Sequence, residues 1–122
     1  MIFTLPVKAL SINQAFQGRR FKTNACKQYD NEVSMCLMPF RKNTIKGYVS
    51  IHYKFYLKNW KMTDGDNLVK VVQDNIVKSG IIEDDRKILK YVIEKFPVEL
   101  SPLITTVKEC IWVCIEEYND TF

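Results

Sequence analysis

The chain has few of the residues that build zinc sites. Its 122 residues include one histidine, His52, and four cysteines whose spacing does not match paired C-x-x-C ligands. A structural zinc site is therefore not expected. We expect the cysteines to be reduced thiols in a cytosolic protein, where free cysteine behaves as a small buried hydrophobe.

Long hydrophobic runs are also absent. No apolar run approaches the ~20 residues that cross a bilayer. The N-terminus lacks the basic flank and long apolar region of a signal peptide. No linker, repeat or low-complexity segment interrupts the chain. We therefore expect one domain over residues 1–122, in the cytoplasm and without a membrane partner.

The net charge of +4 conceals an asymmetry between the two halves. Residues 1–61 contain eleven Lys or Arg and two acids, whereas residues 62–122 contain seven and twelve. A basic surface gives sequence-independent affinity for a phosphate backbone. The alternative is a solvated surface with scattered lysines. The candidate DNA-binding residues are Arg19, Arg20, Lys22, Lys27, Arg41 and Lys42.

Hydrophobic periodicity gives the order of the secondary structure. The clearest strand is 48–58, where apolar and more polar residues alternate. Residues 8–23 show no clear period and are expected to be an irregular loop, and 98–108 are ambiguous. The remaining predictions are a strand at 2–5, a helix from a cap at Asn24 to Pro39, a helix at 68–79 capped by Asp66 or its neighbour, and strands at 88–96 and 109–116.

This order, β-α-β-α-β-β, predicts the α+β fold class. We expect a two-layer domain with a mixed sheet of about four strands and two main helices.

The most informative feature is the stretch 62–70, Met-Thr-Asp-Gly-Asp-Asn-Leu-Val-Lys, read together with the acidic segment 83–85. Magnesium takes oxygen ligands, usually one or two carboxylates, and leaves its other positions to water and phosphate. Asp64, Asp66 and Asp85 can supply carboxylates, and Lys70 can hold a phosphate. This composition is typical of a metal-dependent phosphodiesterase.

The three aspartates can meet only if the chain doubles back after the second helix. From Leu68 to Ser79 a helix spans roughly 18 Å, and an extended return from Gly80 to Asp85 covers roughly 20 Å. The lengths fit if Gly80 makes a tight reversal. The alternative remains open that Asp-Gly-Asp-Asn is only a turn with a helix cap and Glu-Asp-Asp only a solvated loop.

A calcium loop fits less well. An EF-hand that starts at Asp64 needs an oxygen ligand at position 68 and glycine at position 69, and the chain has Leu68 and Val69 there.

The spacing of these residues resembles the RusA family of Holliday-junction resolvases. The resemblance rests on Asp64-Gly-Asp66-Asn67-Leu-Val-Lys70, followed by Asp74, Gly80 and Asp84-Asp85. Leu5-Pro6 and Ser11-Ile-Asn13 also resemble the family's opening, without its usual second proline. Only residues 64–85 are specific, and Gly65 stands where the family often has a bulkier residue.

The resemblance implies a homodimeric, magnesium-dependent endonuclease, with manganese able to replace magnesium. It would cut four-way DNA junctions by paired nicks during recombination and repair, in the bacterial cytosol and encoded by host or phage. Carried over by position, Asp64, Asp66 and Asp85 are the metal-binding carboxylates and Lys70 the essential lysine. Asp84 is a further candidate ligand and Asn67 a supporting residue.

Two other functions remain open. One is a metal-dependent nuclease of other branched DNA, and the other is a DNA-binding module without catalysis whose acidic cluster is structural. Phe16 and Phe21 flank the basic loop, and they either stack on unpaired bases or anchor the loop to the core.

Overall fold

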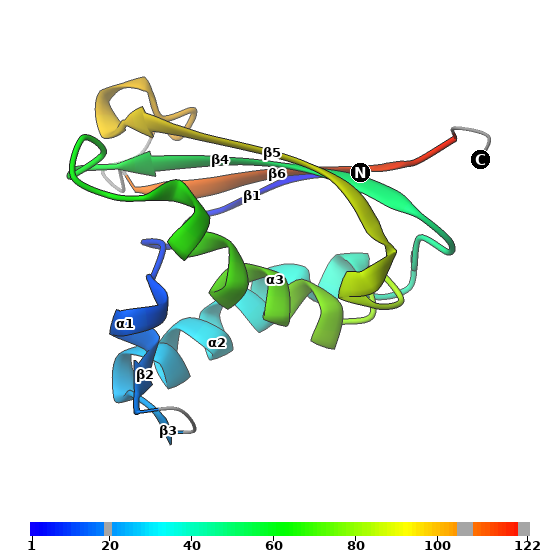
Figure 1. The fold of residues 1–122 in the computed structure, drawn as a ribbon, viewed down its shortest axis with the longest axis horizontal. Helices are drawn as coiled ribbons and strands as arrows, with labels where there is room; N and C mark the ends of the chain where they lie inside the picture. The colour runs from blue at the N-terminus through cyan, green and yellow to red at the C-terminus, as the bar shows by residue number, and fades with distance from the viewer. Residues whose placement is uncertain (19–20, 105–108, 120–122) are drawn as a thin grey trace.

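A four-stranded sheet and a layer of helices against one of its faces form the two layers of the protein (Figure 1). The computed structural model describes residues 1–18, 21–104 and 109–119. Arg19 and Arg20, two of the predicted DNA-binding residues, therefore lie outside the described residues. So does 105–108, part of the stretch that the sequence left ambiguous.

The sheet contains β1 (Ile2–Leu5), β4 (Val49–Leu57), β5 (Ile88–Pro97) and β6 (Cys110–Glu117) in the order β1-β6-β4-β5. The pair β4–β5 is parallel and the other pairs are antiparallel. Because β4 alternates along its first seven residues, its side chains at 49, 51, 53 and 55 are buried beneath the helices. The mixed four-stranded sheet confirms the prediction.

The two main helices are α2 (Asn24–Leu37) and α3 (Val69–Lys78). Thr23 caps α2, since its side chain accepts a hydrogen bond from the Cys26 amide at 3.2 Å. Buried residues of both helices, such as Val33, Val72 and Ile76, join the core against β4 and β6. The α+β class and the β-α-β-α-β-β order of the main elements are confirmed.

The segment 8–23 is more regular than the loop that was expected. It contains α1 (Ile12–Ala15) and a hairpin of β2 (Phe16–Gln17) and β3 (Phe21–Lys22). Ser11 and Gln14 form a capping box in which each side chain accepts from the other's backbone amide. That pairing was visible in the sequence, but the elements are too short to show a period.

The start of the second main helix also differs from the prediction. Gly65–Leu68 form a 3-10 turn, η2, and α3 begins only at Val69. Asp64 occupies the cap position of this turn without a side-chain cap bond. Asp66 therefore lies inside the turn instead of capping the helix.

Short 3-10 turns occupy three further connections. They are η1 (Met38–Phe40), η3 (Asp85–Lys87) and η4 (Val98–Leu100), the last within the ambiguous stretch. All four cysteines are free. Among the described residues, no helix has the length and hydrophobicity needed to span a membrane.

Candidate active site

The turn between β4 and α3 carries the first two predicted metal ligands. Asp64, Asp66 and Asn67 are all exposed. Within the described residues, neither carboxylate of this turn forms a hydrogen bond or an ion pair. The turn therefore presents two hard oxygen donors to solvent, as a divalent cation requires.

Lys70 follows one helical turn later and pairs with Asp74. Its Nζ lies 3.0 Å from Oδ2 of Asp74, and both side chains are about half exposed. A solvent-exposed i,i+4 ion pair of this kind contributes only about 0.3–0.5 kcal/mol. A phosphate can therefore compete with Asp74 for the ammonium group.

The second acidic segment is built differently. Asp84 accepts hydrogen bonds from Arg86, from the backbone amide at 2.9 Å and from Nη2 at 3.0 Å. These hydrogen bonds to the Arg86 guanidinium and amide hold the pKa of the Asp84 carboxyl well below its usual range. Asp85 is exposed at the start of η3. The Asp84 carboxylate thus caps η3 and binds Arg86, whereas Asp85 is exposed to solvent.

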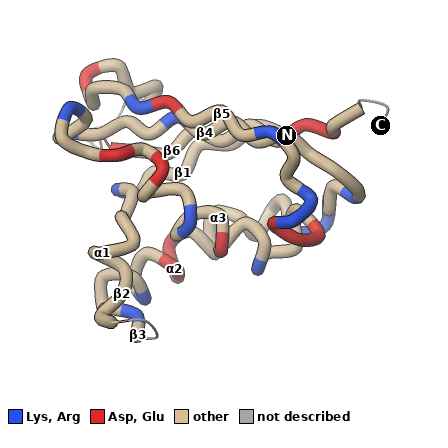
Figure 2. Tube along the Cα trace, in the orientation of Figure 1, with Lys and Arg blue, Asp and Glu red and all other residues tan. Residues whose placement is uncertain are grey.

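The structure does not bring Asp85 to Asp64 within one chain. The first turn lies against the middle of β5, since a Cβ at Gly65 would be 3.1 Å from Cγ2 of Ile93. Asp85 precedes Ile88, and Ile88 to Ile93 alone spans roughly 16 Å. The described residues contain no cluster of three metal-binding side chains. Figures 1 and 2 show the two acidic segments at opposite ends of α3.

The path after α3 explains this separation. The chain does reverse at Gly80, which has a positive φ of 79°. Ile81 and Ile82 are then fully buried, and Ile82 forms a parallel bridge with Ile45. Because the backbone bridge holds 81–82 beside the segment before β4 while their side chains are buried in the core, the return toward Asp66 that the sequence suggested does not occur.

The described DNA-binding candidates come from the hairpin and from the helix layer. Lys22 lies in β3, Lys27 in α2, and Arg41 and Lys42 follow η1. Lys27 and Lys42 are exposed, and Nη2 of Arg41 donates to Oγ of Ser34 at 2.7 Å.

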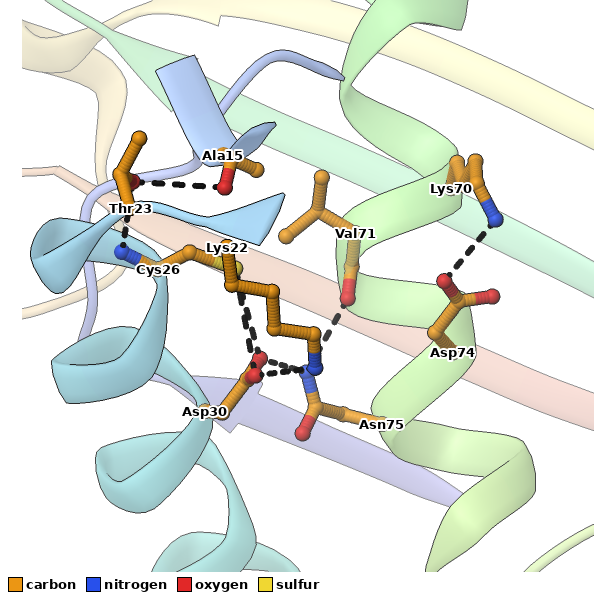
Figure 3. Close-up of polar contacts among 9 residues, drawn as sticks. All are labelled: Ala15, Lys22, Thr23, Cys26, Asp30, Lys70, Val71, Asp74 and Asn75. Atoms are coloured by element: carbon orange, nitrogen blue, oxygen red, sulfur yellow. Dashed lines mark hydrogen bonds and ion pairs between the residues drawn. The ribbon is translucent and has the colours of Figure 1, made fainter. Parts of the chain in front are cut away.

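Lys22 joins the hairpin to α2 through Asp30, which also binds α3 (Figure 3). Its Nζ lies 2.7 Å from Oδ2 of Asp30 on α2, and Nδ2 of Asn75 on α3 donates to Oδ1 of Asp30 at 2.8 Å. The hydrogen bond to Asp30 raises the pKa of Lys22. In the free protein, Lys22 therefore braces the hairpin.

The two aromatic residues of the hairpin have different environments. Phe16 is partly buried and packs against the core, whereas Phe21 is 74% exposed. The anchoring interpretation fits Phe16, and only Phe21 is available for stacking.

A cavity of about 400 Å³ opens beside the first acidic turn. Its wall includes Asp64 and Asn67. It also includes four polar residues for which the sequence predicted no role: Lys8, Asn13, Lys58 and Asn59. The Ser11-Ile-Asn13 motif was visible in the sequence. Its place in the same cavity wall as Asp64 follows only from the fold, because Asn13 and Asp64 are about fifty positions apart in the sequence.

Comparison with known protein families gives one finding that bears on this site. The family model described as endodeoxyribonuclease RusA matches residues 8–107. The match includes the cavity-lining N-terminal segment and both acidic segments. Comparison with curated proteins gives no match.

Proposed function

The chain belongs to the RusA family of endodeoxyribonucleases, and we propose that it is a magnesium-dependent enzyme that resolves four-way DNA junctions by paired phosphodiester hydrolysis. Family membership implies nuclease activity on Holliday junctions, and it is the observation that carries the proposal. Beyond this activity, our proposal includes a role in recombination and repair, dependence on magnesium, and a homodimer.

The donor set at the first turn supports the metal. Asp64 and Asp66 offer exposed carboxylates that have no partners within the described part of the chain. This suits a cation that binds one or two carboxylates and keeps water and phosphate in its other positions. When bound, magnesium would activate water and stabilise negative charge on the phosphate.

The chain's own residues have distinct tasks. Asp64 and Asp66 would hold the cation at the turn that precedes α3. Lys70 leaves its weak pair with Asp74 and donates to a non-bridging oxygen of the phosphate, where a fixed ammonium group stabilises the charge that develops.

We further propose that a second subunit completes each site. An edge strand leaves backbone groups unpaired, and β5 is the edge of the sheet, with exposed apolar side chains at Leu89, Tyr91 and Ile93. When two copies of a strand pair antiparallel across a two-fold axis, residues at equal distances on either side of the axis lie opposite each other. An axis near Leu89 would therefore bring the η3 turn of the partner subunit, which carries Asp85 just before β5, toward Ile93, where the Asp64 turn lies.

The proposal is tested by cleavage of a synthetic four-way junction with fixed sequence, with and without magnesium. Wild type should cut two opposite strands, and only with the metal. Asp66→Asn should abolish cutting but leave junction binding largely unchanged, because the amide keeps the shape of the carboxylate and loses its charge. Glu32→Gln, an exposed acid on α2, is the matched control and should cut like wild type.

Two outcomes would contradict the proposal. Normal cutting by Asp66→Asn at ordinary magnesium concentrations would remove this turn from the site. Binding of the junction by wild type without any magnesium-dependent nick would leave a DNA-binding module. A panel of flaps and forks in the same assay measures the preference for four-way junctions.

A further inference from the structure

We infer that the cavity beside Asp64 binds one nucleotide of the DNA strand next to the scissile phosphate and reads its base. This inference rests on the proposed function, since it names the part of the substrate that the same site recognises. The volume of about 400 Å³ lies within the roughly 300–1,000 Å³ of typical ligand sites.

Three side-chain amides in the wall of this cavity have no hydrogen-bond partner among the residues that the structure describes. Asn13 belongs to α1, Asn59 follows β4 and Asn67 lies in η2. Within the described part of the chain, none of these side chains forms a hydrogen bond. Each amide offers a donor and an acceptor, the combination that recognises base edges.

Two lysines add an affinity for phosphate. Lys8 and Lys58 line the same cavity, and the structure gives neither of them an ion pair within the described residues. Contacts to phosphate position a strand, and contacts to base edges give sequence information. The cavity contains both kinds of group.

The wall that carries Asn13 is held in place. The capping box of Ser11 and Gln14 closes α1, and Oγ1 of Thr23 donates to the carbonyl oxygen of Gln14 at 2.8 Å. These bonds join α1 to the start of α2, so Asn13 is presented from a braced turn. Such preorganisation lowers the entropic cost of binding.

The position of the cavity relates it to the cut. Asp64 and Asn67 form part of its wall, and both belong to the turn that would hold the cation. A nucleotide in the cavity therefore lies directly beside the phosphodiester that is hydrolysed, and its base should affect the rate at that position.

The first experiment measures base preference. Four-way junctions that differ only in the bases flanking the mapped cut are cleaved by wild type, Asn13→Ala and Asn59→Ala. The ratio of single-turnover rates between the best and the worst base should fall roughly tenfold in each variant, because a lost base contact of this kind is worth about one order of magnitude. Asn31→Ala, an exposed asparagine on α2, should keep the wild-type ratio.

The second experiment does not depend on activity. A DNA trinucleotide is titrated into the ¹⁵N-labelled full chain while the side-chain amide signals are followed by NMR. The signals of Asn13, Asn59 and Asn67 should shift, and that of Asn31 should not. Unmoved signals of the three cavity residues would overturn the inference.

The two experiments separate this inference from the proposed function. If wild type cuts the junction at equal rates for all bases, or if the best-to-worst rate ratio is unchanged in both variants, the cavity does not read a base. The proposed nuclease activity would then stand. If the NMR signals of the cavity amides shift but the protein never cuts DNA, nucleotide binding in the cavity is supported and the proposed nuclease activity is refuted.

Discussion

The two ends of α3 carry acidic segments that resemble each other in sequence and differ in structure. At the first end, Asp64 and Asp66 are exposed and lack partners within the described residues. At the other end, Asp84 is bound by Arg86, the preceding Ile81 and Ile82 are buried, and the backbone of Ile82 is bridged to Ile45 before β4. The carboxylates before α3 can bind a ligand, whereas most of the segment after α3 stabilises the fold.

This difference shows that a pair of carboxylates has no fixed role. A carboxylate that already accepts charge-assisted hydrogen bonds has less affinity left for a cation, because binding must first break those bonds. Asp84 is in that position and Asp85 is not. In the proposed dimer, the candidate ligands are therefore Asp64 and Asp66 of one subunit and Asp85 of the other, and Asp84 is the weakest of the four candidates.

The largest expected effect comes from mixing two inactive variants. In the proposed dimer, each site combines Asp64 and Asp66 of one subunit with Asp85 of the other. A mixed dimer of Asp66→Asn and Asp85→Asn subunits, purified by two different tags, should contain one intact site and nick one strand of the junction. Both parent homodimers should be inactive.

The control for this mixing test is a dimer of wild-type and Asp66→Asn subunits, which should also retain one site. If that control nicks the junction and the doubly mutant mixed dimer does not, each site is built within one subunit. The two ends of α3 would then not share a cation.

A smaller effect separates the two neighbouring aspartates. Asp85→Asn should lower the cleavage rate to background, at least roughly a hundredfold, since even residues that only orient a metal ligand are worth about 10–100-fold. Asp84→Asn should cost less than Asp85→Asn, because the Asp84 oxygens bind Arg86. The measurement is the single-turnover rate across a magnesium titration, and equal losses in the two variants would refute the assignment.

The smallest effect concerns the buried isoleucine that follows α3. Ile82→Ala should lower the free energy of unfolding by about 2–5 kcal/mol, because it removes a fully buried side chain and leaves a cavity. Urea unfolding followed by circular dichroism measures the change. Ile104, which is fully exposed, provides the control, since Ile104→Ala should change the stability by less than about 0.5 kcal/mol. An unchanged stability of Ile82→Ala would mean that burial does not fix this segment.

Much of the fold could be predicted because its signals are local. The alternation in 48–58 gave β4, the helical spacing gave α2 and α3, and Gly80 marked the reversal that its positive φ confirms. The short α1 and the hairpin β2–β3 were missed, because four helical residues and two-residue strands show no period. The capping box at Ser11 was the one available signal.

The sequence by itself determined the chemistry that this protein can offer: paired carboxylates, a lysine one helical turn on, and family membership that rests on their spacing. The tertiary structure alone decided which of these groups lie together. It placed Asn13 beside Asp64 and set Asp85 at the opposite end of α3. The reason is physical, since side-chain chemistry is fixed residue by residue, whereas distances between remote residues depend on which segments the core buries and pairs. Here Ile82 is buried and its backbone is bridged to Ile45.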